Sequence, residues 1–366
     1  MRKFLLRCSI LVSVVSLICV FIIHYDTYNI FHWNNIRFTS AEPNKNFVKT
    51  KYIIRNPNKF NAYILGSSRI GNIPPALLPS QKDGKKLNWY NMTYSQGLPS
   101  EHLLTLETFL KNGVSIDMVI LGFDDIAMYS SIEEHYNQLL RMPYQVFENN
   151  EIAFLKPYFM SLPAVSIIKE VTTYDPSEHK ANHNSFYHFG VSQNNLNYSL
   201  GMEAQSFPSA HQGVTYTQID SYKDIESIYK LCKEKNIHLI LLTNPIYITT
   251  YIDSIQDGYL DFLRKVAQNC EFYNFSTLNN YCQDSRYYFE GSHYRPALGL
   301  IVEKVLFGTE DEQNEIRNEA GDELFGVKVN AENIDFIISE LEKQLQKYKK
   351  ELRPAIKSQQ IIFENL

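Results

Sequence analysis

A serine in a tight turn, and a glutamate three residues before a histidine, are the residues of this chain best suited to chemistry. Ser68 lies in YILGSSRIGN, residues 63–72, directly after a short apolar run. Glu290 and His293 lie in EGSH, a Gly-Ser turn just ahead of Pro296. A carboxylate on Nδ1 of a histidine fixes its tautomer, and Nε2 can then take a proton from a serine hydroxyl. Together these three side chains could form a nucleophilic triad.

Both motifs also have a purely structural interpretation. Turns that follow strands favour Gly, which tolerates positive φ, and Ser, which bonds to nearby backbone. The spacing of Glu290 and His293 is also common by chance. The sequence alone therefore leaves Ser68 open as a nucleophile or a turn residue.

Short apolar segments alternate with amphipathic ones through most of the chain. Apolar residues at helical spacing predict helices at 100–113, 222–236 and 255–268. Strands that alternate with helices of this length require crossover connections, so we predict an α/β fold with a parallel sheet covered on both faces. Its five predicted strands lie at 62–66, 87–92, 117–123, 237–244 and 271–276.

Several candidate functional residues directly follow these strands. Ser68 follows the first strand, Gly97 the second, Asp124 the third and Asn244 the fourth. In an open parallel sheet, functional side chains gather beyond the carboxyl ends of the strands. We therefore expect these residues to share one edge of the sheet.

Residues 1–25 predict a transmembrane anchor. Arg2, Lys3 and Arg7 precede an almost uninterrupted apolar stretch, and residues 5–25 supply roughly the 20 residues that cross a bilayer. A cleaved signal peptide would end in small residues, and a buried core helix would show a polar face; neither is seen. The basic residues at the start place the N-terminus in the cytoplasm and the rest of the chain outside it.

The remainder of the chain divides by composition. A connector at 26–59 leads to the α/β domain at 60–308, which is interrupted after its third strand by an aromatic insertion, or cap, at 126–217. A C-terminal helical extension occupies 309–366 and contains an amphipathic helix at 330–354. That helix either packs on its own domain or docks a partner.

Composition excludes several classes of function. A net charge of −5 and a pI near 6.1 argue against nucleic acid as a partner. The stretch GSSRIG fits neither a dinucleotide fingerprint nor a P-loop, and the five cysteines contain no Cys-x-x-Cys pair. His179, His183 and His188 lie among Asn and Ser with no evident helix. We therefore predict no metal and no cofactor.

Four stretches resemble, in chain order, the four sequence blocks of the SGNH hydrolase superfamily, also called GDSL-type esterases: GSSR at 66–69, YNMTYSQG at 90–97, GFDD at 122–125 and EGSH at 290–293. The resemblance covers about 60–126 and 218–308. It implies a three-layer, flavodoxin-like sandwich around a parallel sheet of about five strands. It also implies serine-dependent chemistry on acyl esters.

The resemblance assigns roles to individual residues. Ser68 is implied as the nucleophile, and the backbone N–H groups of Ser68 and Gly97 as the oxyanion hole. Asp124 stands where the family has an oxyanion-binding Asn, and an ionised carboxylate there would repel the oxyanion. Either Asn244 or backbone groups replace that donor, or Asp124 has another role, or activity is weak. Glu290 stands where the family has Asp, a milder change because Glu can also orient a histidine.

The expected function is that of an extracytoplasmic serine ester hydrolase or O-acyltransferase. The anchor resembles that of envelope proteins that work beside a membrane-bound O-acyltransferase, such as the lipoteichoic acid D-alanylation and alginate acetylation proteins. The implied substrate is an O-acetylated cell-envelope polysaccharide. Arg69 and Arg295 could bind an anionic glycan or be solvated surface residues. The alternative is a catalytically weak adaptor or glycan-binding subunit of an envelope assembly.

The orientation of the anchor can be tested on intact cells. If the basic end of the anchor lies in the cytoplasm, protease added outside, or in the periplasm after the outer membrane is opened, should degrade residues 26–366. Complete protection of this segment, with cleavage only after cell lysis, would contradict the orientation.

Overall fold

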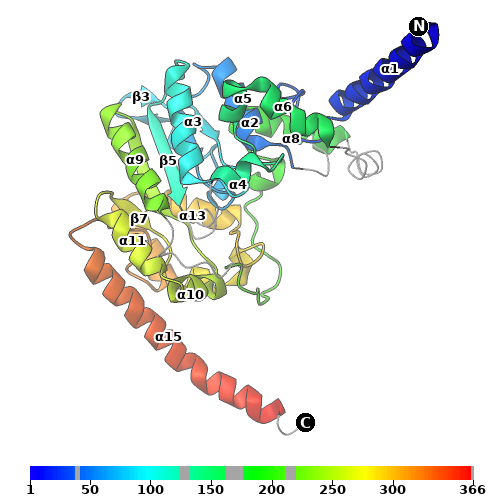
Figure 1. The fold of residues 1–366 in the computed structure, drawn as a ribbon. Helices are drawn as coiled ribbons and strands as arrows, with labels where there is room; N and C mark the ends of the chain where they lie inside the picture. The colour runs from blue at the N-terminus through cyan, green and yellow to red at the C-terminus, as the bar shows by residue number, and fades with distance from the viewer. Residues whose placement is uncertain (38–41, 124–131, 162–175, 212–219, 364–366) are drawn as a thin grey trace.

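The fold is a mixed α/β structure built on one central sheet (Figure 1). It is seen in a computed structural model, which describes residues 1–37, 42–123, 132–161, 176–211 and 220–363. The six strands lie in the order β4-β1-β5-β6-β7-β8. Their bounds are Ala62–Leu65 (β1), Trp89–Asn91 (β4), Met118–Phe123 (β5), His238–Thr243 (β6), Phe272–Asn274 (β7) and Val327–Val329 (β8).

All five predicted strands are present, and they pair in parallel. The sixth strand, β8, was not predicted: it lies in the C-terminal extension and pairs antiparallel with β7. The chain runs outward from β1 to β4 and then returns to the other side of β1 with β5. Sheets of this order bind ligands where the direction reverses, beyond the carboxyl ends of those central strands.

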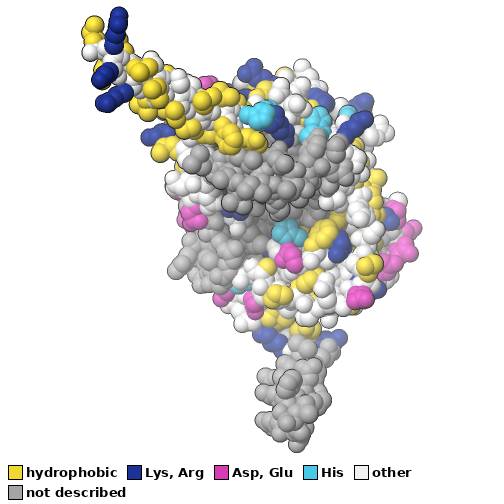
Figure 2. Space-filling view, turned by 90° about the vertical axis from the view of Figure 1, so that its right-hand side faces the viewer, with side chains coloured by type: hydrophobic (Ala, Val, Ile, Leu, Met, Phe, Trp, Pro, Cys, Tyr) yellow, Lys and Arg dark blue, Asp and Glu magenta, His cyan; other side chains and the backbone are white. Residues whose placement is uncertain are grey.

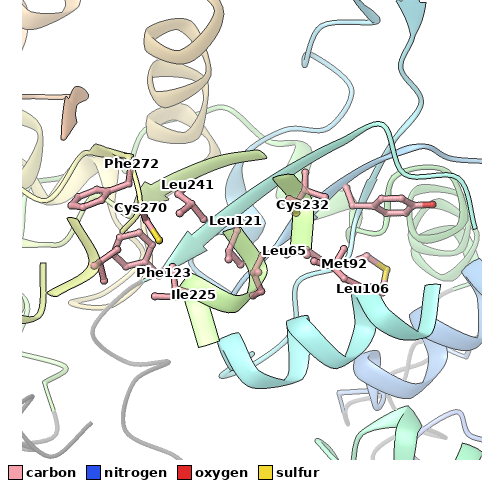
Figure 3. Packing of buried hydrophobic residues seen from close by; sticks show 14 of the residues in the cluster. Leu65, Met92, Leu106, Leu121, Phe123, Ile225, Cys232, Leu241, Cys270 and Phe272 are labelled. Atoms are coloured by element: carbon pink, nitrogen blue, oxygen red, sulfur yellow. The ribbon is translucent and has the colours of Figure 1, made fainter. Parts of the chain in front are cut away.

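Alternate residues of each strand face opposite sides of the sheet and enter two separate cores. Leu65, Leu121 and Leu241 are register partners on three neighbouring strands and share one core (Figure 3). Their chain neighbours Ile64 and Ile120 belong to the other core. Burying a side chain of this size contributes about 1.5–3 kcal/mol. The central strands are therefore continuously apolar, as expected for a sheet covered on both faces.

Helices cover both faces. The first core receives side chains from α2 (Lys45–Arg55), α3 (Pro99–Lys111), α9 (Ser221–Glu234), α11 (Tyr259–Ala267) and the start of α15 (Ile334–Phe363). The second receives them from η1 (Ile70–Asn72), α13 (Pro296–Phe307) and α14 (Glu310–Ala320). The packing of Ile337, Ile338 and Leu341 supports the expectation that the amphipathic C-terminal helix packs on its own domain.

Two local predictions were wrong, and the connector contains a helix that was not predicted. The single helix expected at 255–268 is divided into α10 (Ile248–Gln256) and α11, because Gly258 adopts φ 97° between them. The connector contains the buried helix α2. The histidine-rich stretch of the insertion, where no helix was evident, lies in α8 (Pro176–Phe189).

The N-terminal helix α1 (Arg2–Tyr25) extends away from the rest of the molecule (Figure 1). An 18-residue apolar window of this helix has a mean hydropathy of 2.6, and only 6% of that window is buried. Hydrophobic side chains cover it, and basic side chains lie at its free end (Figure 2). It is a candidate for a single membrane span or a signal sequence.

Three glycines meet at the carboxyl ends of the central strands. Gly66 ends β1 with φ 133°, and a Cβ at this position would lie 2.6 Å from the carbonyl oxygen of Gly122. A Cβ on Gly97 would lie 2.6 Å from the carbonyl oxygen of Gly66. The turn that carries Ser68 is therefore fixed by direct backbone contact with β5 at Gly122 and with the chain that follows β4 at Gly97.

Gly66→Ala should destabilise the protein more than a glycine replacement in open space. Gly113 also has positive φ, 68°, but a Cβ added there would meet no other atom within 4 Å. Gly113→Ala should cost about 1–2 kcal/mol from backbone strain alone. Gly66→Ala must also displace neighbouring backbone, which should lower the free energy of unfolding by about 1–3 kcal/mol more. Urea unfolding followed by circular dichroism measures both, and equal losses would contradict a close backbone contact at Gly66.

Candidate active site

Ser68, His293 and Glu290 form a continuous hydrogen-bonded chain. Oγ of Ser68 lies 2.7 Å from Nε2 of His293. Nδ1 of the same imidazole lies 2.5 Å from Oε1 of Glu290. The side chains of His293 and Glu290 are 35% and 47% exposed, so the chain of hydrogen bonds is open to a ligand. The geometric expectation for these three residues is met.

The glutamate and histidine share a tight hairpin just before α13. An isolated bridge joins Tyr288 to Tyr294, and the N–H of Phe289 donates to the carbonyl of His293 at 2.8 Å. The carboxylate of Glu290 also accepts the backbone N–H groups of Ser292 and His293, at 2.9 and 2.8 Å. The turn therefore presents the carboxylate and the imidazole together, as the three-residue spacing predicted.

The charge of Glu290 is maintained by the same contacts. Burial alone would raise the pKa of this carboxyl. The hydrogen bond and charge of the His293 side chain, with the two backbone N–H groups of the turn, outweigh burial and lower the pKa below its ordinary value. Glu290 is therefore ionised at neutral pH and suited to stabilise an imidazolium on His293.

Arg69 holds the hairpin against the serine turn. Its side chain is only 1% exposed, and Nε and Nη2 lie 3.3 and 3.2 Å from Oγ of Ser292. The guanidinium of Arg69 is therefore not a solvated surface group, and Arg69 is not among the residues that line the pocket described below. Arg295 is half-buried, donates to the carbonyl of Tyr288 at 3.0 Å and stacks 4.4 Å above the ring of Phe289.

A pocket of about 260 Å³ opens beside the three residues. The insertion forms one of its walls, so this part of the insertion covers the site as expected. Among its described residues, the insertion contributes the ring of Phe186, and Phe289 of the hairpin adds another ring. The remaining lining residues are Lys45, Lys49, Gly71, Asn72, Thr93, Tyr94, Gly190, Val191, Ser192 and Asn195.

The proposed oxyanion donors differ in their hydrogen bonds and in their position relative to the pocket. The N–H of Ser68 makes no hydrogen bond with the residues that the structure describes. The N–H of Gly97 donates to the carbonyl of Tyr94 at 3.2 Å, and Gly97 does not line the pocket. Asp124 lies outside the described residues. Asn244 is fully buried, and its side-chain oxygen accepts the hydroxyl of Tyr294, so it supports the hairpin instead of facing the pocket.

Two residues at the start of α3 support the site and were missed from the sequence. His102 accepts the N–H of Gly66 on Nε2 at 3.0 Å. Glu101 accepts the hydroxyl of Tyr94 and Nδ1 of His135, both at 2.9 Å. Both side chains are buried. In the sequence, a glutamate next to a histidine in an amphipathic helix gives no sign of such a role. Only the structure shows that they bond Gly66, Tyr94 and His135.

Lys49 was also missed, because nothing in its helix marks it as buried. Only 1% of it is exposed, and Nζ donates to the carbonyls of Asn91 and Thr93 at 2.9 and 2.6 Å. Burial lowers the pKa of its amine well below the ordinary value, and the charge of Lys45 adds to this effect. The amine fixes the chain that leaves β4 and lines the pocket.

No group of three or more His, Cys, Asp or Glu side chains suited to a metal occurs in the described part of the chain. The five cysteines are free thiols.

The sequence matches no protein-family model and no curated protein. Function is therefore inferred from the geometry of the site and from the order of its sequence motifs.

The role of His102 can be tested through the pH dependence of stability. Burial lowers the pKa of His102 to about 3 from 6.5, so folding favours the neutral imidazole. This contribution is complete above pH 6.5 and is lost as the pH falls from 6.5 toward 3. His102→Gln retains an acceptor for Gly66, so it should weaken the loss of stability in this range.

Urea unfolding at several pH values provides the measurement. His102→Leu should also flatten the profile, and should in addition lower stability by about 1–3 kcal/mol at neutral pH because the N–H of Gly66 loses its acceptor. His188→Gln, at an exposed histidine of α8, serves as the control. An unchanged acid profile in His102→Gln would show that His102 is not the buried neutral acceptor.

Proposed function

We propose that the protein is a serine esterase or O-acyltransferase of the SGNH type. The observation that carries the proposal is the chain of hydrogen bonds from Ser68 through His293 to Glu290, beside an open pocket. A serine with a purely structural role in its turn would not need, 2.7 Å from its hydroxyl, a histidine that a carboxylate orients. The site also lies where the strand order reverses, as in other doubly wound sheets.

The reaction divides into two steps at the same atoms. Oγ of Ser68 attacks the ester carbonyl carbon while Nε2 of His293 takes the hydroxyl proton. The proton then passes to the oxygen of the leaving alcohol as its bond to the acyl carbon breaks. Water or a sugar hydroxyl next attacks the acyl carbon and gives its proton to Nε2 of His293. As the bond from the acyl carbon to Oγ breaks, His293 returns this proton to Oγ and Ser68 is regenerated. Glu290 remains ionised and stabilises the imidazolium throughout.

The same proposal includes the substrate and the setting. An O-acetylated polysaccharide of the cell envelope fits a pocket with aromatic walls on a chain with an apolar N-terminal helix. In this proposal α1 anchors the protein with its N-terminus in the cytoplasm and the α/β domain outside. A membrane-bound O-acyltransferase would supply the acyl group if the reaction is a transfer. The SGNH assignment is supported by the order of the four motifs at the strand ends.

A second candidate function is a binding subunit with weak catalysis. It is favoured by the hydrogen bond from the N–H of Gly97 to Tyr94, which leaves the N–H of Ser68 as the available backbone donor of the proposed pair. Loss of one oxyanion donor can reduce the rate by about 10²–10³. Such a subunit would still bind a glycan in the pocket.

Ser68→Ala separates the two candidates. If Ser68 is the nucleophile, this variant should lose turnover of an aryl acetate and should change acetylation of the envelope glycan in cells. Its stability should change by at most about 1 kcal/mol, because only a partly exposed hydroxyl is lost. Ser67→Ala is the matched control, since it removes a hydroxyl from the same turn without touching His293.

The histidine should behave as part of the same unit. His293→Ala should reduce turnover nearly as much as Ser68→Ala, and the double variant should be little worse than either. Full activity of Ser68→Ala, or equal losses in Ser68→Ala and Ser67→Ala, would contradict the enzyme proposal. Intact glycan binding by an inactive wild-type protein would instead support the binding subunit.

A further inference from the structure

The base of α1 marks the level at which the chain would leave a bilayer. The helix ends at Tyr25, and Phe21 and Tyr25 pack together one turn apart. Aromatic side chains of this kind gather at the interface between lipid and water. The next residue, Asp26, is buried in the folded domain. If α1 spans the membrane, as the proposed function has it, the lipid–water interface falls at the junction between α1 and the domain.

This junction is held by several polar contacts. The carboxylate of Asp26 accepts the backbone N–H groups of Ile30, Phe31 and His32 at 2.7–2.8 Å, and Nδ1 of His32 lies 2.9 Å away. The guanidinium of Arg37 donates to the carbonyl of His24, in the last turn of α1. A helix fixed in this way sets the orientation of the domain relative to the membrane.

Helix α6 (Glu151–Met160) lies at the same level. It contacts α1, and its last turns pack on the segment that follows the junction. The rings of Tyr158 and Tyr28 are 5.9 Å apart, and those of Phe159 and Phe31 are 5.5 Å apart. Figure 1 shows α6 beside the base of α1, far from the start of α15.

One face of α6 is apolar and exposed. Ile152 and Met160, two turns apart, are 79% and 75% exposed, and exposed Lys156 lies between them. Successive members of this set are four residues apart, so they form a single stripe along the helix. A lysine with a long apolar stem suits the headgroup region, where its amine reaches phosphate. The stripe borders Phe159, which packs toward the junction.

We propose that α6 lies on the bilayer surface beside α1, with Ile152 and Met160 in the boundary between headgroups and acyl chains. The ligand of this face is lipid, because the face continues from the helix that enters the membrane and carries a basic residue between two apolar ones. The domain would then contact the membrane at two places, and could not rotate freely about its anchor.

The test uses the full-length protein in nanodiscs of brominated phospholipid, which quenches nearby tryptophan. Met160→Trp and Ile152→Trp place the probe on the stripe, and Phe336→Trp is the matched control at an exposed position of α15. The signal of the unsubstituted protein, which contains Trp33 and Trp89, is subtracted. Both stripe probes should lose fluorescence, most with bromine near the headgroups, while Phe336→Trp should not.

Each other outcome would overturn the proposal. Equal fluorescence of stripe and control probes in brominated and ordinary lipid would show that the face does not touch the bilayer. Stronger quenching by bromine at the chain ends would place α6 within the hydrocarbon instead of on its surface. Quenching of Phe336→Trp to the same extent would show that contact is not specific to this face. Because the probes are exposed, circular dichroism should confirm unchanged folding.

Discussion

The close contact of backbone at the ends of β1, β4 and β5 is the constraint on which the site depends. Gly66 can lie against the carbonyl of Gly122, and Gly97 against the carbonyl of Gly66, only because Gly66 and Gly97 have no side chain; the missing side chain of Gly122 leaves room for Ile70. The N–H of Gly66 is then turned toward His102. Two residues later the chain reaches Ser68, so the serine is positioned by backbone contacts and not by its own hydrogen bonds.

The histidine arrives from 225 residues further along the chain, and several contacts fix its position. The guanidinium of Arg69 donates a hydrogen bond to the hydroxyl of Ser292. The hydroxyl of Thr250 donates to the carbonyl of Gly291 at 2.6 Å. The hydroxyl of Tyr294 donates to the side-chain oxygen of Asn244. Each contact involves a residue adjacent to Glu290 or His293 and leaves the catalytic candidates themselves open. Ordering a loop this distant in sequence costs conformational entropy, which these buried polar contacts help to offset.

The sequence predicted those features of the fold that depend on local patterns of apolar residues. Apolar runs located the five parallel strands, whose shared edge was expected to hold Ser68. The pairing of Ser68 with His293 was predicted from the chemistry of the two residue types and from the three-residue spacing of Glu290 and His293, since EGSH directly follows none of these strands. The sequence did not predict β8, whose short segment is stable only when paired with β7. Nor did it predict the burial of Arg69 and Lys49, since charged residues are buried only where distant partners satisfy them. The position of Asp124 lies outside the described residues.

The insertion links the base of α1 to the pocket by direct contacts. The hydroxyl of Tyr187 in α8 accepts the N–H of Ile36 at 3.0 Å and donates to the carbonyl of Trp33 at 2.8 Å, both shortly after the anchor. Three residues later, Gly190 touches the backbone of Asn91 at the end of β4 and lines the pocket. The pocket wall and the junction with α1 thus share one short helix. The hydrogen bonds of Tyr187 and the wall residue Gly190 therefore tie the order of the segment after α1 to the order of the pocket wall.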